Sequence, residues 1–222
     1  MAFYKPGKLS REVPLKGNET TALLFIDTQI YNCDRAGAIY QSFTDADKDD
    51  EEIMHFYRGV DAAIRNWQTL QNAAREAGVE VLYTVIQSST KDGRDRGLDY
   101  KISGFHVPPG SVDGNVLPQI APLDDEIVLP KTSSSLFNST CIHYILGNLG
   151  IKQLIICGCV TDQCVEHAVR DACDLNYLVT LATDACVTYS RQRQEASLKA
   201  IAGYCRQCTT EEVRAELQQL TK

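Results

Sequence analysis

The sequence predicts a single α/β domain, a three-layer α/β/α sandwich with a mainly parallel, doubly wound sheet. Short apolar runs typical of buried strands alternate along the chain with segments whose apolar residues recur at helical spacing. The length of 222 residues and the hydrophobic content of 44% suit one domain with a sizeable core. Alternating strands and helices favour a parallel sheet covered by helices on both faces. We place the domain at residues 21–220, after an N-terminal arm over residues 1–20.

The first half of the chain predicts two strands, a long helix and a long loop. Residues 21–27 (TALLFID) and 79–86 (VEVLYTVI) are short apolar runs and are expected to form strands. Between them, residues 52–77 carry apolar side chains at helical spacing, and Gly78 follows as a C-terminal stop. Residues 87–125 are rich in Gly, Pro, Asp and Ser. A loop of that length is usually functional or contains short elements of its own.

The second half continues the alternation of strands and helices. The remaining strands are expected at residues 126–129, ended by Pro130, and at residues 152–157 and 177–182. The remaining helices are expected at residues 139–149, capped by Ser139 or Thr140 and stopped by Gly150, directly after the turn at Gly158, at 191–204 and at 210–219.

The charge balance argues against a nucleic-acid or membrane partner. The chain has 29 acidic and 22 basic residues, a formal net charge of -7, whereas such partners call for a basic face. No apolar run approaches the roughly 18 residues of a membrane span, and the N-terminal residues lack the apolar core of a signal peptide. Nine cysteines, an odd number, therefore predict reduced thiols in a cytoplasmic protein rather than a disulfide scaffold.

Cys205 and Cys208 form an isolated C-x-x-C at the end of a helical stretch. A zinc site would need two further ligands at suitable spacing, and none is evident. A redox motif would normally open a helix after a strand. We interpret this pair as structural.

Cys164 is the most informative residue of the chain. It follows the apolar run 154–157 and the turn at Gly158, in or near the first turn of a helix. A helix N-terminus has unpaired N–H groups and a partial positive charge, which favour the nucleophilic thiolate. A low pKa would make Cys164 react with iodoacetamide before the other cysteines. Such a cysteine is placed for covalent catalysis, and the alternative is a small buried hydrophobe.

Asp27, Lys131 and Asp184 also stand at or just after predicted strand ends, where parallel α/β folds place their sites. A carboxylate can take the thiol proton and later give it to a leaving group. A lysine can orient that carboxylate, lower its pKa and help to stabilise the thiolate. The N–H groups of Val160 and Cys164 can hold an oxyanion. Each residue alone could be structural, but Asp27, Lys131 and Cys164 together make a coherent catalytic set.

Three separated segments resemble the isochorismatase-like cysteine hydrolases, and the order of strands and helices matches that family from about residue 20 to residue 220. The segments are FIDTQ (25–29), LPKTSSSLFNST (129–140) and GCVTDQCVEHAVRDA (158–172). The resemblance implies that Asp27, Lys131 and Cys164 form a catalytic triad. It also implies a cis peptide bond between Cys159 and Val160.

The segment after the second strand distinguishes this chain from the nicotinamidases of that family. Those members carry a metal-binding D-x-H-x-x-H there, whereas this chain has QSSTKDGRDRGLDYK (87–101) and no histidine before His106. A lone loop histidine such as His106 is usually neither a ligand nor a general acid. We therefore expect no metal and no cofactor. The segment is similar to that of members that act on ureido and carbamoyl acids, or on isochorismate.

The substrate-binding candidates are less specific than the triad. Arg94, Arg96 and Lys101 in the long loop could clamp a substrate carboxylate, since a guanidinium fork matches it bidentately. The alternative is a solvated charged loop. Further candidates to line the pocket are Gln29, Tyr31 and Phe137. Tyrosine and phenylalanine at such positions are more often core or rim residues.

Two reactions on a small carboxylated metabolite remain open. In the first, Cys164 attacks an amide or ureido carbonyl, Asp27 protonates the departing nitrogen, and water clears the thioester. In the second, Asp27 protonates the vinyl ether of isochorismate, giving pyruvate and 2,3-dihydro-2,3-dihydroxybenzoate without a thiol nucleophile. The presence of Cys164 favours the first. A catalytically silent binding protein is a third hypothesis, which the complete triad disfavours.

The expected partners are a small-molecule substrate and further copies of the chain. The resemblance implies a homodimer or homotetramer, and a homo-oligomer is also the common state of soluble enzymes.

Overall fold

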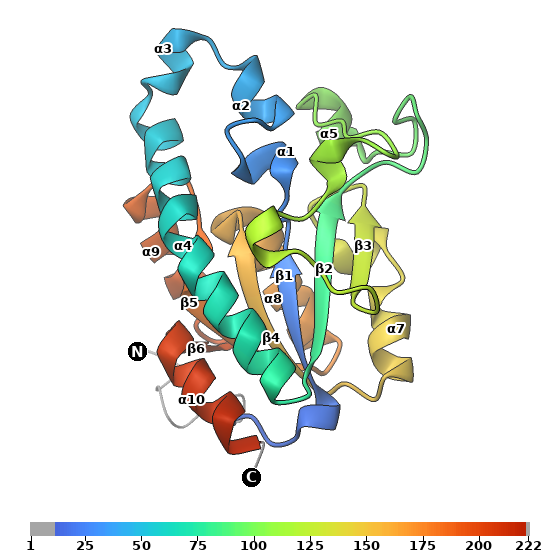
Figure 1. Cartoon of the computed structure of the whole chain (residues 1–222), viewed down its shortest axis with the longest axis vertical. Coiled ribbons are helices and arrows are strands. Elements are labelled where there is room, and N and C mark those ends of the chain that lie inside the picture. The colour runs from blue at the N-terminus through green and yellow to red at the C-terminus, as the bar shows by residue number, and fades with distance from the viewer. Residues whose placement is uncertain (1–11, 221–222) are drawn as a thin grey trace.

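A computed structural model describes residues 12–220, which form a six-stranded sheet between layers of helices (Figure 1). The strand order is β3-β2-β1-β4-β5-β6, and every neighbouring pair runs parallel. The chain enters at β1, extends to β3 at one edge, crosses back to β4 and extends to β6 at the other edge. This order makes the sheet doubly wound, so the predicted fold class is confirmed. Residues 1–11 of the expected N-terminal arm lie outside the described part.

The elements alternate along the chain as expected. The strands are β1 (Thr21–Ile26), β2 (Glu80–Ile86), β3 (Ile127–Lys131), β4 (Gln153–Cys159), β5 (Leu178–Val187) and β6 (Arg206–Cys208). The longer helices are α4 (Glu51–Glu76), α7 (Ile142–Asn148), α8 (Glu166–Asp174), α9 (Arg191–Ile201) and α10 (Thr210–Leu220). The short helices are α1 (Ile30–Cys33), α2 (Ala38–Ser42), α3 (Asp45–Lys48), α5 (Leu98–Ile102) and α6 (Leu136–Ser139). Within residues 12–220, no helix has the length and apolarity needed to cross a bilayer.

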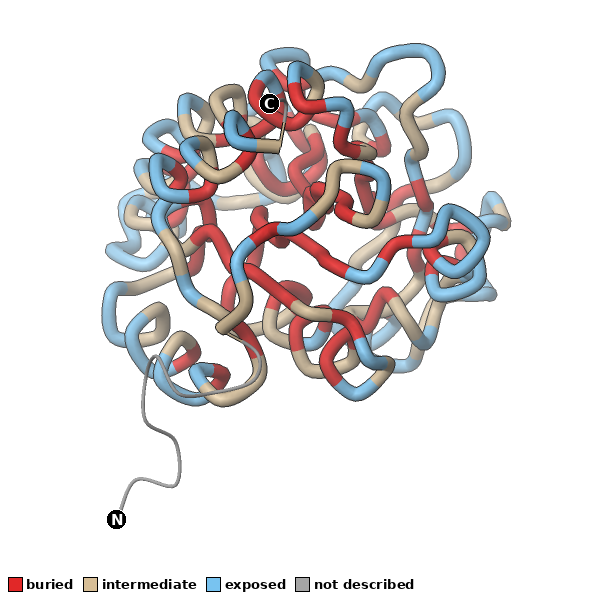
Figure 2. The backbone as a smooth tube through the Cα atoms, turned by 90° about the horizontal axis from the view of Figure 1, so that it is seen from below, coloured by how far each residue is buried: buried red, intermediate tan, exposed pale blue. Residues whose placement is uncertain are grey.

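The long helix α4 covers one face of the sheet, with α10 beside it, and α8 lies on the opposite face (Figure 1). The N-cap of α4 is Asp50, whose carboxylate accepts hydrogen bonds from the backbone N–H groups of Glu52 and Ile53. Its apolar stripe is buried against the sheet. Trp67 in this stripe is fully buried, and its indole N–H donates to the carbonyl of Ala185 in β5 at 2.8 Å. The predicted amphipathic helix is therefore confirmed. Figure 2 shows the buried segments running through the middle of the molecule, surrounded by exposed turns.

The sequence predicted that the third strand ends at Pro130, and this prediction is wrong. β3 continues through Pro130, which pairs with Val85 of β2, to Lys131, which pairs with Ile86. Because β3 is an edge strand, a residue without an N–H can be accommodated where no further strand needs its donor. Lys131 is thus the last residue of a strand and not the first residue of a loop.

The second half of the chain differs from the prediction in three further places. The helix predicted at residues 139–149 is divided, because Ser139 ends α6 and α7 begins at Ile142 after the N-cap residue Cys141. β5 extends to Val187, so Asp184 lies inside the strand and not after its end. α9 ends at Ile201, and Cys208 lies in the short edge strand β6. A strand of three residues is too short to show a period in the sequence.

The backbones of β1 and β4 approach each other closely at their carboxyl ends, next to Asp27 and the turn that leads to Cys164. Ile26 pairs with Gly158, whose φ is +121°. A Cβ atom at Gly158 would lie only 2.2 Å from the carbonyl oxygen of Ile26, a distance at which the two backbones would have to separate. Glycine therefore lets the end of β1, followed by Asp27, lie beside the end of β4, which leads to Cys164.

We predict that Gly158→Ala lowers the free energy of unfolding by at least about 3 kcal/mol, because it combines an unfavourable φ with a backbone clash. Gly147→Ala in α7 is the matched control, since a Cβ there meets nothing within 4 Å. It should leave stability unchanged or raise it by up to about 1 kcal/mol. Urea unfolding measures both. Equal stability of the two variants would show that the close approach is not a constraint.

Candidate active site

Three of the residues predicted at strand ends meet in one buried cluster. Asp27 follows β1, Lys131 ends β3, and Cys164 lies in a π-helical turn (Thr161–Val165) after β4. Lys131 Nζ lies 2.9 Å from Asp27 Oδ2 and donates a hydrogen bond to Cys164 Sγ at 3.3 Å. Their exposed fractions are 1% for Asp27, 0% for Lys131 and 6% for Cys164. The fold thus brings together side chains from three separate parts of the sequence.

The carboxylate of Asp27 is held from both sides. The backbone φ is +52°, a left-handed conformation that aspartate adopts more readily than most residues. Its N–H donates to the Thr84 carbonyl at 3.0 Å, and the Thr84 hydroxyl donates to Asp27 Oδ1 at 3.0 Å. With Oδ1 bonded to Thr84 and Oδ2 paired with Lys131, the carboxylate has one fixed orientation.

Lys131 is a fully buried cation with several acceptors. Besides Cys164, its Nζ donates to Tyr100 Oη at 2.9 Å and to the Ser133 carbonyl at 3.0 Å. Burial alone would lower the pKa of Lys131, but the Asp27 carboxylate, followed by Cys164 and Tyr100, holds this pKa well above its ordinary value. The side chain therefore remains an ammonium group at the centre of the cluster.

Cys164 is a thiol in the resting site, contrary to the expectation of a low pKa. Burial raises the pKa of Cys164 to about 12; the Lys131 ammonium acts in the opposite direction, and the Asp27 carboxylate adds to the increase. Loss of solvation therefore outweighs the stabilisation of the thiolate by the Lys131 ammonium. At neutral pH the thiol keeps its proton until a base removes it.

Tyr100 is a member of the cluster that was not predicted from the sequence. It lies in α5, it is 1% exposed, and its hydroxyl oxygen lies 2.9 Å from Lys131 Nζ and 3.9 Å from Cys164 Sγ. Burial raises the pKa of Tyr100, so the hydroxyl remains neutral. The available signal was that Tyr100 is the single aromatic residue in the polar stretch 87–101.

The turn between β4 and Cys164 has the expected backbone form, since the Cys159–Val160 peptide bond is cis. The Asn32 side chain links this turn to Asp27. Its Nδ2 donates to the Asp27 carbonyl at 3.1 Å and to Cys159 Sγ at 3.2 Å. Val160 and Cys164 both line the pocket described next, and their role in holding an oxyanion remains a prediction.

A narrow pocket leads to Cys164, with an open volume of about 40 Å³. Its lining combines aromatic and aliphatic side chains with a few polar groups. The lining residues are Asp27, Asn32, Ile39, Ile86, Asp99, Tyr100, Phe105, Ser134, Cys159, Val160, Gln163, Cys164 and Tyr189. The thiol is therefore buried but reachable by a small molecule.

Three candidate substrate contacts do not line this pocket. The Gln29 side chain is fully buried, and its Nε2 donates to the carbonyls of Ile86 and Asp113 at 3.1 and 2.9 Å. The Tyr31 hydroxyl accepts a hydrogen bond from the His106 N–H at 3.2 Å. Phe137 packs against Tyr177, with ring centroids 6.1 Å apart. These contacts stabilise neighbouring segments of the fold.

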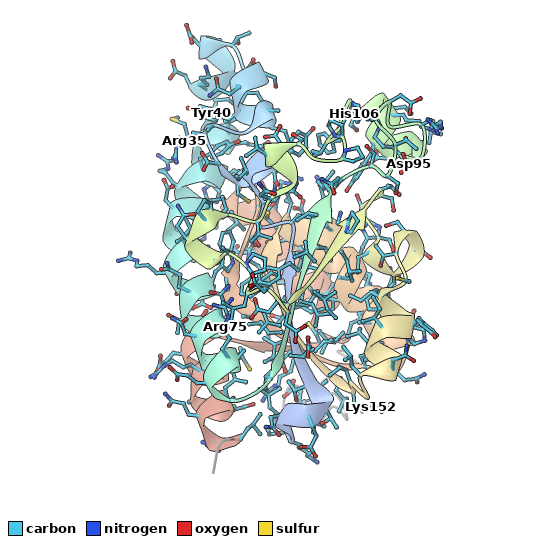
Figure 3. All side chains as sticks on the ribbon, turned by 45° about the vertical axis from the view of Figure 1, so that its right-hand side comes forward. Arg35, Tyr40, Arg75, Asp95, His106 and Lys152 are labelled. Atoms are coloured by element: carbon cyan, nitrogen blue, oxygen red, sulfur yellow. The ribbon has the colours of Figure 1, made fainter. Side chains whose placement is uncertain are left out.

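The cations of the long loop also lie away from the pocket. Arg94 is paired with Asp92 at 3.0 Å, and its side chain is 73% exposed. Arg96 donates to the carbonyls of Gly93 and Phe105, so it shapes the loop from within. Lys101 is exposed on α5. His106, seen with Asp95 on this loop in Figure 3, has a buried Nε2 with no hydrogen-bond partner in the described chain.

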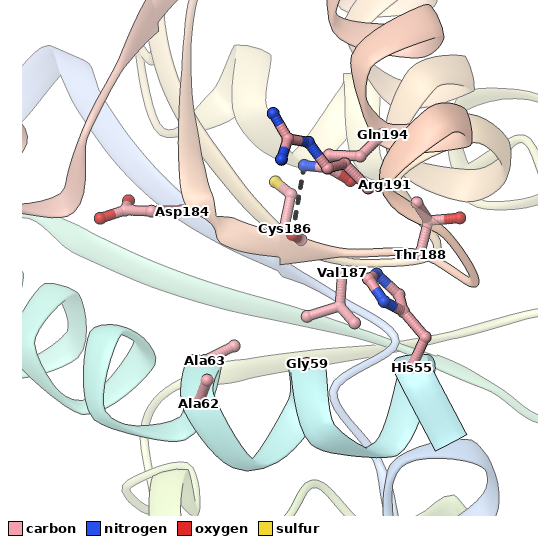
Figure 4. A pocket seen from close by; sticks show the side chains of 10 residues that line it. All are labelled: His55, Gly59, Ala62, Ala63, Asp184, Cys186, Val187, Thr188, Arg191 and Gln194. Carbon is pink, nitrogen blue, oxygen red and sulfur yellow. Dashed lines mark hydrogen bonds between the residues drawn. The ribbon is translucent and has the colours of Figure 1, made fainter. Parts of the chain in front are cut away.

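A larger pocket of about 350 Å³ lies between α4, β5 and α9 (Figure 4). Asp184, a strand-end candidate in the sequence, lines this pocket and not the one at Cys164. Its Oδ1 accepts hydrogen bonds from the Thr210 N–H and hydroxyl at 2.7 and 2.8 Å. Asp184 therefore anchors the start of α10. Over residues 12–220, no group of three or more His, Cys, Asp or Glu side chains is placed to hold a metal ion.

Comparison with protein families finds a match to the isochorismatase domain over residues 21–213. An N-carbamoylsarcosine amidase from Arthrobacter sp is 35% identical over 119 residues, 51% of this chain and 45% of that protein. Nicotinamidase 3 from Arabidopsis thaliana is 29% identical over 152 residues, 67% of this chain and 75% of that protein. The chain thus spans less than half of the first relative's length.

Solved structures show the same fold. A cysteine hydrolase from Pseudomonas syringae pv. phaseolicola 1448A superposes with a TM-score of 0.79 at 24% identity. The superposition covers 94% of this chain and 96% of that one. At this level of identity, the likeness concerns the architecture alone.

We predict that iodoacetamide modifies the exposed Cys141 before Cys164, because the Cys164 thiol is buried and its pKa is raised to about 12. Only the thiolate reacts, so the rate at Cys164 should rise about tenfold for each pH unit from about pH 7 to pH 9.5, past the point at which an ordinary cysteine with a pKa of about 8.5 levels off. Peptide mass spectrometry measures both sites. Faster labelling of Cys164 than of Cys141 at neutral pH, or a plateau below pH 9, would contradict the raised pKa. Cys141→Ala identifies the fast adduct.

Proposed function

The chain belongs to the isochorismatase family, and we propose that it is a hydrolase that cleaves the C–N bond of an amide or ureido group through a thioester on Cys164. The observation that carries this proposal is the buried arrangement in which Lys131 Nζ lies within 3.3 Å of Cys164 Sγ and 2.9 Å of Asp27 Oδ2. A nucleophile, a carboxylate and a fixed cation at the end of a pocket are the parts that acyl transfer requires.

In the first step, Cys164 attacks the carbonyl carbon. Because the resting thiol is protonated, its proton must leave as the S–C bond forms, and the Asp27 carboxylate is the base beside it. The Lys131 ammonium then faces the developing negative charge on sulfur and stabilises it. The backbone N–H groups of Val160 and Cys164 are the proposed donors to the oxyanion.

In the second step, Asp27 returns the proton to the departing nitrogen, and the C–N bond breaks. The acyl group is then held as a thioester on Cys164. Asp27, again a carboxylate, takes a proton from water as the water attacks the thioester. The S–C bond breaks, the acid leaves, and the proton returns to the Cys164 sulfur. Protons therefore balance over the cycle with one group, Asp27, acting in turn as base and acid.

The alternative reaction on isochorismate has less support. It would begin with a proton on Asp27, donated to a vinyl ether. In the resting site Asp27 Oδ2 pairs with a fully buried ammonium group, whose pKa is held well above its ordinary value. The proton available at the start is on Cys164, whose pKa is raised to about 12. The thioester route therefore starts from the proton that Cys164 carries, and it needs no proton on Asp27 at the start.

The two relatives also favour cleavage of an amide bond, since both are named as amidases. Their named substrates differ in charge, because carbamoylsarcosine carries a carboxylate and nicotinamide does not. The sequence led us to expect a carboxylated substrate held by Arg94 and Arg96. Neither residue lines the pocket, so this part of the expectation is without structural support.

We predict that Cys164→Ala loses at least about a thousandfold in kcat/KM on any amide that the wild-type chain hydrolyses, because the nucleophile is absent. Ammonia release from a panel of ureido compounds and amides, with isochorismate tested in parallel for pyruvate release, measures this. Cys141→Ala is the control, as it removes an exposed thiol outside the pocket and should keep full activity. Full activity of Cys164→Ala on isochorismate, with no amide cleaved by the wild type, would contradict the thioester proposal.

A further inference from the structure

We propose that the pocket disfavours amides that carry a negative charge, and that Asp99 makes it prefer amides that carry an ammonium group. This inference rests on the proposed hydrolysis of a C–N bond and concerns the class of substrate. It follows from the charged residues that line the pocket and from the contacts that the nearby basic side chains already make elsewhere.

The pocket has acidic residues in its lining and no basic ones. Among the described residues that line it, none is lysine, arginine or histidine, whereas Asp27 and Asp99 are both present. Asp27 is neutralised by the Lys131 ammonium at 2.9 Å. Asp99 has no cation within ion-pair distance in the described chain. The unbalanced charge that a bound molecule meets is therefore negative.

None of the three candidate cations of the loop lines the pocket, and Lys101 is exposed to solvent on α5. Arg94 is exposed and paired with Asp92. Arg96 uses its Nε to hold the Gly93 carbonyl at 2.9 Å and its Nη1 to hold the Phe105 carbonyl at 2.5 Å. Turning Arg96 toward a substrate would release these carbonyls and undo the loop that carries Phe105 into the pocket wall.

The remaining wall is mainly aromatic and aliphatic, and its other polar side chains are uncharged. The aromatic and aliphatic residues are Tyr100, Phe105, Tyr189, Ile39 and Ile86, and the uncharged polar ones are Asn32, Ser134 and Gln163. A carboxylate desolvated against such a wall meets no cationic partner to offset the loss of its hydration, and it is therefore disfavoured. An uncharged apolar group loses little solvation free energy when it enters the pocket. An ammonium group is attracted both by aromatic faces and by the Asp99 carboxylate. The pocket is thus expected to rank substrates by charge, with the anionic members last.

Three amides of equal chain length test this ranking. Butanamide is neutral, 4-aminobutanamide carries an ammonium group, and succinamate carries a carboxylate. We expect kcat/KM, measured by ammonia release, to be at least about tenfold lower for succinamate than for butanamide, and highest for 4-aminobutanamide. Cys164→Ala supplies the background rate for each compound.

Asp99→Asn and Asp99→Lys test the residue that sets the charge preference. Because Asp99 is exposed, both variants should fold. Asp99→Asn should remove the advantage of 4-aminobutanamide over butanamide. Asp99→Lys should raise the ratio of succinamate to 4-aminobutanamide by at least about tenfold. Asp92→Lys makes the same change of charge in the same loop without lining the pocket, and it should leave this ratio near the wild-type value.

The outcomes separate the two proposals. If no amide gives ammonia above the Cys164→Ala background, the hydrolysis of C–N bonds fails, and the substrate class fails with it. If the wild type prefers succinamate to butanamide, hydrolysis stands and the charge selection is wrong. If Asp99→Lys and Asp92→Lys change the ratio equally, the effect is one of overall charge, and the role given to Asp99 is overturned.

Discussion

The buried ion pair between Lys131 Nζ and Asp27 Oδ2 is the interaction on which the rest of the site depends. Both side chains are almost wholly removed from water, so loss of either one leaves an uncompensated charge, which typically costs about 3–5 kcal/mol. β1 and β3 are not neighbours, because β2 lies between them, so the pair spans β2 at the carboxyl ends of the strands. Thr84 of β2 orients the same carboxylate. The sheet order and the chemistry of the site are therefore linked through one contact.

The same burial determines the protonation state of the nucleophile. The Lys131 ammonium favours a thiolate at Cys164, but loss of solvation outweighs it and raises the pKa of Cys164 to about 12. A protonated thiol beside a paired carboxylate is unreactive until a substrate enters. In the proposed mechanism, proton transfer to Asp27 then accompanies formation of the S–C bond, with Lys131 facing the sulfur. Under this proposal Asp27 acts in turn as base and acid, and the buried, protonated thiol is expected to react slowly with small electrophiles when no substrate is bound.

The fold and the three central residues could be predicted because their signals are local. Apolar periodicity marks β1, β4 and α4, and strand ends of a parallel sheet converge wherever they lie in the sequence. Other features depend on contacts that no local pattern records. Pro130 fits inside β3 only because β3 is an edge strand. Arg96 turns inward because the folded loop presents carbonyls to it, and Tyr100 reaches Lys131 through a helix of five residues inside a polar loop. The raised pKa of Cys164 follows from burial, which becomes visible only when the layers are assembled.

The most direct test of the central claim is the partition of a common acyl-enzyme between water and hydroxylamine. Two substrates are chosen that share one acyl group but release different amines. If both pass through the same thioester on Cys164, the ratio of hydroxamate to acid at a given hydroxylamine concentration must be identical for the two, even where their overall rates differ. Different ratios, or no hydroxamate while both amides are hydrolysed, would show that water attacks the substrate directly and that Cys164 forms no acyl intermediate.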